Sequence, residues 1–125
     1  MIVGTVNQNY EAVISLVMRG PTGSSRKVDA VIDTGFSGFL TLPFPIIVSL
    51  SLRWRGEAQD FLGDGRRHQF DVYSATVEWD GRDRHVEIDV AETSPLVGMG
   101  LLAGHDLHIQ AVTGGKVSIE ARLAQ

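Results

Sequence analysis

The chain has 125 residues, of which 43% are hydrophobic and 21% charged, and this composition predicts one globular domain spanning residues 1–125. It contains no cysteine, which excludes disulfides, thiolate metal sites and cysteine nucleophiles and favours a reducing, cytoplasmic location. The net charge of −4 argues against a nucleic-acid partner, and no apolar stretch is long enough to predict a membrane segment or a secretion signal.

Short segments rich in β-branched and alternating apolar residues follow one another along the first half of the chain. Segments 12–18 and 27–32 flank the turn-forming residues 20–25 and are expected to pair as antiparallel strands. Residues 40–43 predict a short strand, and residues 45–52 predict one or two helical turns because Pro45 suits a helix start. Segments 57–62 and 69–79 then predict a hairpin with its turn at Gly63-Asp64-Gly65.

The second half continues in the same way. After a turn at residues 80–83, residues 85–90 alternate between apolar and polar and predict another strand. Residues 96–104 predict a short strand and a single helix, and segments 107–112 and 116–121 predict a closing hairpin. Many short strands separated by turns are typical of a mostly β barrel or sandwich.

Arginines are concentrated in the middle of the chain. Acidic residues are interleaved with them, so the first interpretation is a solvated strand face, and the alternative is selection of an acidic substrate. The six arginines are Arg53, Arg55, Arg66, Arg67, Arg82 and Arg84.

The segment Val31-Ile32-Asp33-Thr34-Gly35 carries the clearest chemical signal. Two apolar β-branched residues place a carboxylate at the end of a strand, and the residues that follow supply a hydroxyl and a permissive backbone. A carboxylate held and partly buried in this way suits general-base catalysis. An ordinary strand-end turn is the alternative, and the tripeptide alone does not decide between them.

A second element, Leu96-Val97-Gly98, begins 63 residues after Asp33, and the predicted hairpin at residues 57–79 lies between the two. This arrangement resembles the retropepsin-like aspartic proteases, single-domain half-pepsins that act as homodimers, and is closest to their small prokaryotic members. The resemblance implies a mostly β, closed β-barrel with one short helix. It also implies the residue roles: Asp33, Thr34 and Gly35 would be catalytic, and Phe36, the flap residues Gly63, Asp64 and Gly65, and Leu96 would bind substrate.

The implied activity is hydrolysis of peptide bonds by an aspartic endopeptidase. Two Asp33 carboxylates of a homodimer would share one proton and activate a water molecule, and Thr34 would form a hydrogen bond across the dimer. The expected substrate is an extended peptide or protein, and no cofactor or metal is expected. Two residues depart from the family pattern: Phe36, where most members have Ala or Ser, and Gly100, where Asn or Asp is common.

Two alternative functions remain. The first is a catalytically silent dimer of the same fold that binds peptide or a partner protein, which Phe36 and Gly100 favour. The second is an unrelated small β-barrel interaction module.

Three other patterns resemble functional motifs only weakly. The glycine-rich segment 98–104 has the wrong spacing for a dinucleotide loop, and too few residues follow it for a crossover helix and strand. His105 and His108 would need a third metal ligand, so hydrogen-bonded surface or boundary histidines are expected. Ser37 has no neighbouring histidine and does not fit a nucleophile elbow.

Overall fold

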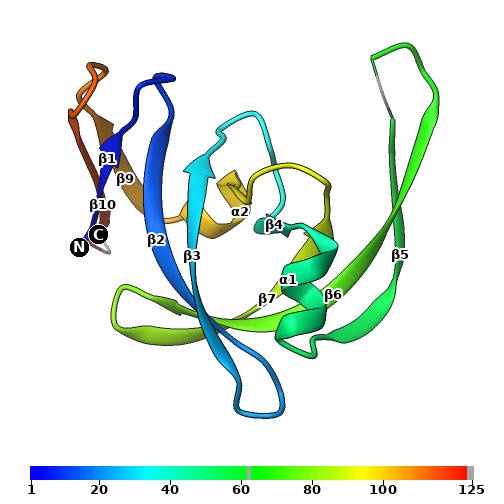
Figure 1. The fold of residues 1–125 in the computed structure, drawn as a ribbon. Helices are drawn as coiled ribbons and strands as arrows, with labels where there is room; N and C mark the ends of the chain where they lie inside the picture. The colour runs from blue at the N-terminus through cyan, green and yellow to red at the C-terminus, as the bar shows by residue number, and fades with distance from the viewer. Residues whose placement is uncertain (62, 124–125) are drawn as a thin grey trace.

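The computed structural model describes residues 1–61 and 63–123, which form ten strands and two short helices (Figure 1). The helices are α1 (Phe44–Ser49) and α2 (Met99–Leu102). The strands are β1 (Ile2–Val6), β2 (Ala12–Arg19), β3 (Ser25–Ile32), β4 (Leu40–Leu42), β5 (Arg53–Phe61), β6 (Arg67–Trp79), β7 (Arg82–Val90), β8 (Leu96–Val97), β9 (His105–Ile109) and β10 (Lys116–Ala121). The prediction of a mostly β chain is confirmed.

All the strands belong to one sheet, in the order β5-β6-β7-β4-β8-β3-β2-β1-β10-β9, and β6 also pairs with β2. This last pairing joins six strands into a ring, in which Met18 lies opposite Val77 and both side chains are fully buried. The sequence predicts a closed β-barrel, and the structure shows this ring with β5 attached on one side and β1, β10 and β9 on the other. Alternating apolar residues of the ring strands fill the core.

Three details differ from the sequence predictions. The resemblance implies one short helix, whereas the described residues contain two. The helical turns expected from residue 45 form α1, which starts one residue earlier: Pro43 is its extended N-cap residue, and Pro45 fits the first turn. Strand β1 was not predicted, because it is short and contains Gly4; its pairing with β2 and β10 holds it extended.

The turn between β6 and β7 is tighter than the predicted turn at residues 80–83. Trp79 pairs with Arg82, so only Asp80 and Gly81 form the turn, with φ angles of 51° and 80°. Two positive φ angles are typical of the hairpin turn whose twist matches that of the flanking strands.

Strand β8 determines where the loop after β3 lies. It pairs in parallel with β3, with Leu96 opposite Val31, and antiparallel with β4, with Val97 opposite Leu40. Because parallel strands end at the same edge of a sheet, the loop that follows β3 meets the turn that follows β8.

Within residues 1–61 and 63–123, no helix has the length and apolar character needed to span a membrane.

Candidate functional site

Asp33 directly follows β3, and the sheet fixes its backbone. Its N–H donates to the carbonyl oxygen of Val97 at 2.9 Å, which extends the pairing of β3 with β8 by one residue. Its Oδ1 accepts a hydrogen bond from the N–H of Gly35 at 3.0 Å, and the residue is half-buried. The geometry therefore provides a carboxylate that is held on one side and open to water or substrate on the other.

Thr34 and Gly35 form the exposed tip of this loop. A Cβ at residue 35 would lie 3.3 Å from Oδ1 of Asp33, so glycine leaves room for the backbone N–H to reach the carboxylate. The Thr34 residue is exposed and is open to contacts from outside the chain.

Backbone hydrogen bonds attach the loop to the turn between β8 and α2. The N–H groups of Gly98, Met99 and Gly100 donate to the carbonyl oxygens of Phe39, Phe36 and Gly38, at 3.0, 2.8 and 3.0 Å. The two segments lie so close that a Cβ at residue 98 would be 2.2 Å from the oxygen of Gly38, and one at residue 100 would be 2.9 Å from it. This close approach explains why residue 100 is glycine in this chain, although glycine departs from the family pattern at this position.

Phe36 packs back onto its own loop. A Cβ at residue 38 would lie 2.5 Å from Cζ of Phe36, and one at residue 98 would lie 2.6 Å from Cδ2. The half-buried ring therefore covers Gly38 and Gly98. Its position gives it a packing role within the chain, and its predicted substrate-binding role stays a prediction.

The structure does not bring the predicted flap residues to Asp33. Gly63, Asp64 and Gly65 lie at the tip of the β5–β6 hairpin, which extends away from the body of the molecule and from α2 (Figure 1). The tip is a turn in which Oδ1 of Asp64 accepts from the N–H of Arg66 at 3.0 Å, and Gly65 has a φ of 84°.

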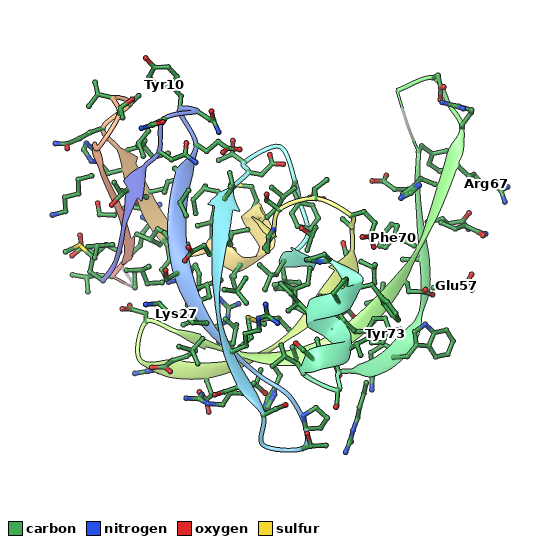
Figure 2. All side chains as sticks on the ribbon, in the orientation of Figure 1. Tyr10, Lys27, Glu57, Arg67, Phe70 and Tyr73 are labelled. Carbon is green, nitrogen blue, oxygen red and sulfur yellow. The ribbon has the colours of Figure 1, made fainter. Side chains whose placement is uncertain are left out.

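The hairpin has an inner and an outer side. Figure 2 shows Phe70 on the side toward the body of the molecule and Glu57 and Arg67 on the side away from it. Pairing of β5 with β6 places Asp60 and His68 on the same side as Phe70, because residues two apart on a strand share a face. These residues therefore form the inner side of the hairpin.

Leu96 is half-buried in β8, and its backbone N–H donates to Oγ1 of Thr41 at 2.9 Å. Thr41 is the buried polar residue of the described core, and this bond satisfies its hydroxyl oxygen. The sequence did not indicate this role for Thr41.

Asp89 is a carboxyl group beside the loop that sequence reasoning missed. A Cβ at residue 38 would lie 3.2 Å from its Oδ2, so the Asp89 carboxyl lies against the same loop that carries Asp33. Burial raises the pKa of Asp89 to about 6, with further contributions from the negative charges of Glu87 and Asp60. The alternation of Val86, Ile88 and Val90 already indicates that residue 89 faces away from the core. Its proximity to Gly38 depends on the pairing of β7 with β4, which the sequence does not reveal.

The weaker motifs do not form sites among the described residues. His105 and His108 both lie on β9, where residues three apart point to opposite faces. His105 accepts a hydrogen bond at Nε2 from Nε1 of Trp79 at 3.1 Å, and its Nδ1 lies 3.0 Å from the carbonyl oxygen of Ala103. This confirms the prediction of a hydrogen-bonded histidine for His105. No group of three or more metal-ligating side chains occurs within residues 1–61 and 63–123.

Comparison with known structures shows the fold. The structure of a retropepsin-like aspartic protease from Rickettsia conorii is similar to this chain, with a TM-score of 0.60 and 15% sequence identity, and the match covers 98% of this chain and 92% of that one. This chain has a retropepsin-like fold. No family model and no curated protein sequence matches it.

The attachment of the loop to the β8–α2 turn leads to a stability prediction. Gly98→Ala places a methyl group 2.2 Å from the Gly38 oxygen, so one segment must move. We expect the free energy of unfolding in urea to fall by about 1–3 kcal/mol. Gly63→Ala is the matched control, because a Cβ there meets nothing within 4 Å. Equal stability of the two variants would show that the loop and the turn separate easily.

The raised pKa of Asp89 leads to a second prediction. The folded state disfavours the charged form of the Asp89 carboxyl. Its contribution to the stability of the folded protein is therefore fully present below the usual pKa of 3.8 and is lost as the pH rises through about 6. Asp89→Asn removes this charge and should raise the free energy of unfolding at pH 8 by about 1 kcal/mol, after allowance for solvent screening of a half-exposed group. The gain should be much smaller at pH 4.

Urea unfolding at pH 4 and pH 8 measures both values. Glu57→Gln removes one negative charge from an exposed position of β5 and is the matched control. A loss of stability on Asp89→Asn at pH 8 would contradict the prediction.

Proposed function

We propose that the chain is an aspartic endopeptidase that acts as a homodimer, with one Asp33 from each copy. The observation that carries this proposal is the fixed, half-exposed Asp33 carboxylate at the end of β3 in a retropepsin-like fold. The fold similarity supports peptidase activity in general terms, and the geometry of the loop supports Asp33 as the reacting group.

A single chain supplies half of the proposed site. The sequence contains one Asp-Thr-Gly, at residues 33–35. A two-fold axis beside the exposed Thr34 would bring two copies of the loop together, with each Thr34 hydroxyl bonded to the other copy.

The chemistry uses two carboxylates in different protonation states. Two carboxylates at short range cannot both ionise, so the pair holds one proton. The ionised Asp33 removes a proton from water, whose oxygen attacks the peptide carbonyl carbon, while the protonated Asp33 donates its proton to the carbonyl oxygen. As the intermediate collapses, the Asp33 that took the proton from water gives it to the leaving nitrogen and the C–N bond breaks, while the other Asp33 regains its proton from a hydroxyl group of the intermediate. The Gly35 N–H keeps Oδ1 of its own Asp33 in place throughout.

The proposed substrate is an extended peptide that lies between the loops and the inner side of the β5–β6 hairpins. Phe70 and the residues that share its face would contact the peptide, and Gly63 and Gly65 at the tip would let the hairpin close as a flap. We place this activity in the cytoplasm, in keeping with a chain that has no cysteine.

The decisive experiment compares the wild type with Asp33→Asn. Asparagine keeps an oxygen that accepts from Gly35 but cannot act as a base, so we expect no cleavage by the variant. A denatured protein mixture is incubated with each protein from pH 4 to pH 8, and the products are identified by mass spectrometry. Asp106→Asn, at an exposed position on β9, is the control and should cleave like the wild type.

Two outcomes would overturn the proposal. Cleavage that persists in Asp33→Asn would assign the activity to another group. A wild type that binds peptides but cleaves none at any pH would favour the catalytically silent dimer.

The dimer requirement has a separate test. Specific activity should fall on dilution in parallel with the dimer fraction measured by sedimentation. Thr34→Val should weaken the dimer about tenfold or more, because it removes an intersubunit hydrogen bond, whereas Thr34→Ser should restore it. Full specific activity from a sedimenting monomer would exclude the two-carboxylate mechanism.

A further inference from the structure

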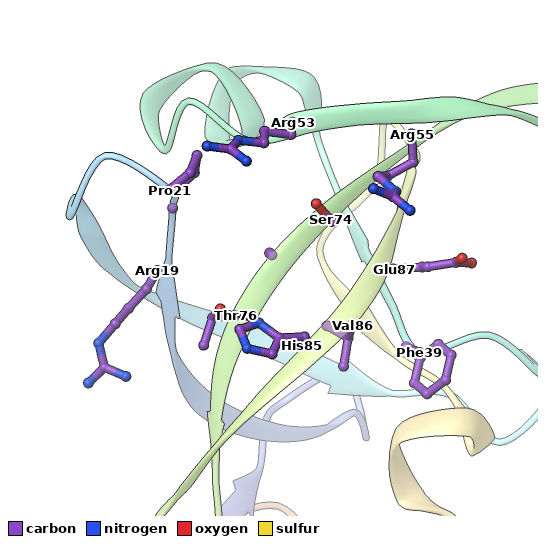
Figure 3. Close-up of a pocket in the computed structure, with 12 residues that line it drawn as sticks. Arg19, Pro21, Phe39, Arg53, Arg55, Ser74, Thr76, His85, Val86 and Glu87 are labelled. Atoms are coloured by element: carbon purple, nitrogen blue, oxygen red, sulfur yellow. Dashed lines mark hydrogen bonds between the residues drawn. The ribbon is translucent and has the colours of Figure 1, made fainter.

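A cavity of about 730 Å³ lies on the face of the β5–β6–β7 part of the sheet that points away from the core, which on β6 is also the face of Phe70 (Figure 3). Its walls come from the turn after β2, the start of β5, Phe39 and the facing residues of β6 and β7. This volume is in the range of pockets that bind small molecules. None of the residues with a proposed catalytic role lines it.

The register of the strands explains why the floor is polar. Ser74 pairs with Glu87 and Thr76 with His85, and these residues alternate with the core-facing Ala75, Val77 and Val86. Oγ1 of Thr76 lies 2.9 Å from Nδ1 of His85. When the Thr76 hydroxyl donates to Nδ1, Nε2 of His85 carries the hydrogen and is left as a donor.

The basic side chains of the cavity differ in their partners. Arg19 is already paired, at 3.1 Å with Glu78 and at 2.7 Å with Asp83. Arg53 and Arg55 come from β5, the strand that pairs with β6 beside this floor, where Arg53 is the register partner of Ser74 (Figure 3). Within residues 1–61 and 63–123 no carboxylate lies within ion-pair distance of either.

The cavity therefore has an excess of positive charge in a chain whose net charge is −4. Glu87 is its acidic lining residue, and within the described ranges no basic group pairs with it either. Two free guanidinium groups outweigh one carboxylate. Guanidinium groups bind carboxylates through two parallel hydrogen bonds, which makes an acidic group the favoured ligand.

The cavity is continuous with the face of the sheet that carries Asp89. Glu87 and Asp89 are two residues apart on β7 and share this face, so they are about 7 Å apart along the strand. Asp89 lies against Gly38, and Phe39, the next residue, lines the cavity. A peptide that extends along this face from the Asp33 loop would reach the cavity with a side chain farther along its length.

We propose that this cavity is an outer subsite that binds an acidic side chain of the peptide through Arg53 and Arg55. The proposal deepens the proposed function and rests on it for the identity of the ligand as a peptide. Phe39 would pack against the aliphatic part of that side chain, and Ser74 would be available to donate to the carboxylate. Glu87 opposes the ligand and limits its affinity.

The test measures binding without cleavage, so that it is independent of catalysis. Two fluorescein-labelled random dodecapeptide pools with amidated C-termini, one with Glu and the other with Gln at a fixed central position, are titrated against the Asp33→Asn protein by anisotropy. We expect the Glu pool to bind about tenfold more tightly. A third pool, with Gln at that position and a free C-terminal carboxylate, distinguishes a terminal from a side-chain acid.

Variants of the cavity should then change affinity in opposite directions. In the Asp33→Asn background, Arg55→Gln and Arg53→Gln should each remove most of the preference for Glu, and Glu87→Gln should increase it. Arg82→Gln is the matched control, because it removes the same charge from β7 at the far end of the hairpin, outside the cavity. Arg53, Arg55 and Arg82 are exposed, so the variants should keep the unfolding midpoint of the parent.

Each outcome separates the two proposals. Equal binding of the Glu and Gln pools, or an equal effect of Arg82→Gln, would overturn the subsite even if Asp33-dependent cleavage is observed. If only the third pool, which has a free C-terminal carboxylate, binds in a way that depends on Arg53 and Arg55, the proposed side-chain subsite is overturned and the ligand is a terminal carboxylate. Arginine-dependent preference for the Glu pool together with a wild type that never cleaves would uphold the subsite and reject the endopeptidase.

Discussion

The short backbone contact between residues 36–39 and the turn at residues 98–100 is the constraint on which the rest of the site depends. Three N–H groups of the turn donate to carbonyl oxygens of the loop, and the N–H of Asp33 donates to β8. Such an approach leaves no space for side chains at Gly98 or Gly100, and the Phe36 ring packs against Gly38 and Gly98. The Asp33 carboxylate is therefore positioned by main-chain hydrogen bonds.

The fold also gives different roles to the two faces of β6 and β7. One face of β6 and β7 supplies Val77, Val86 and Ile88 to the core, and the other carries Ser74, Thr76, His85, Glu87 and Asp89. Parallel pairing of β4 with β7 then brings Asp89 beside Gly38. Burial of Asp89, together with the negative charges of Glu87 and Asp60, disfavours its charged form, which is a cost in stability that packing alone would not select.

The sequence predicts the elements well where apolar residues alternate, as in β2, β3, β6 and β7, and where turn residues such as Gly63 and Gly65 separate them. It also predicts the Asp33 loop, since the residue types in that segment carry the signal themselves. It does not predict β1, whose extended form depends on pairing with distant strands. The sequence likewise does not predict the position of Asp89 beside the loop or the presence of the cavity, because both depend on pairing between distant strands. Among the six clustered arginines, the register alone separates Arg53 and Arg55, which line the cavity, from the others.

Two-fold symmetry would connect the proposed active site with the proposed subsite. A homodimer built around the Asp33 loops places one cavity on each side of the paired carboxylates, at equal distances from them. A peptide has a direction, so the two cavities would bind side chains on opposite sides of the scissile bond, and they need not be filled together. One acidic residue on either side would then suffice for recognition. A peptide with acidic residues at both positions would bind through two linked contacts, and the second contact would form at a high effective concentration once the first has formed.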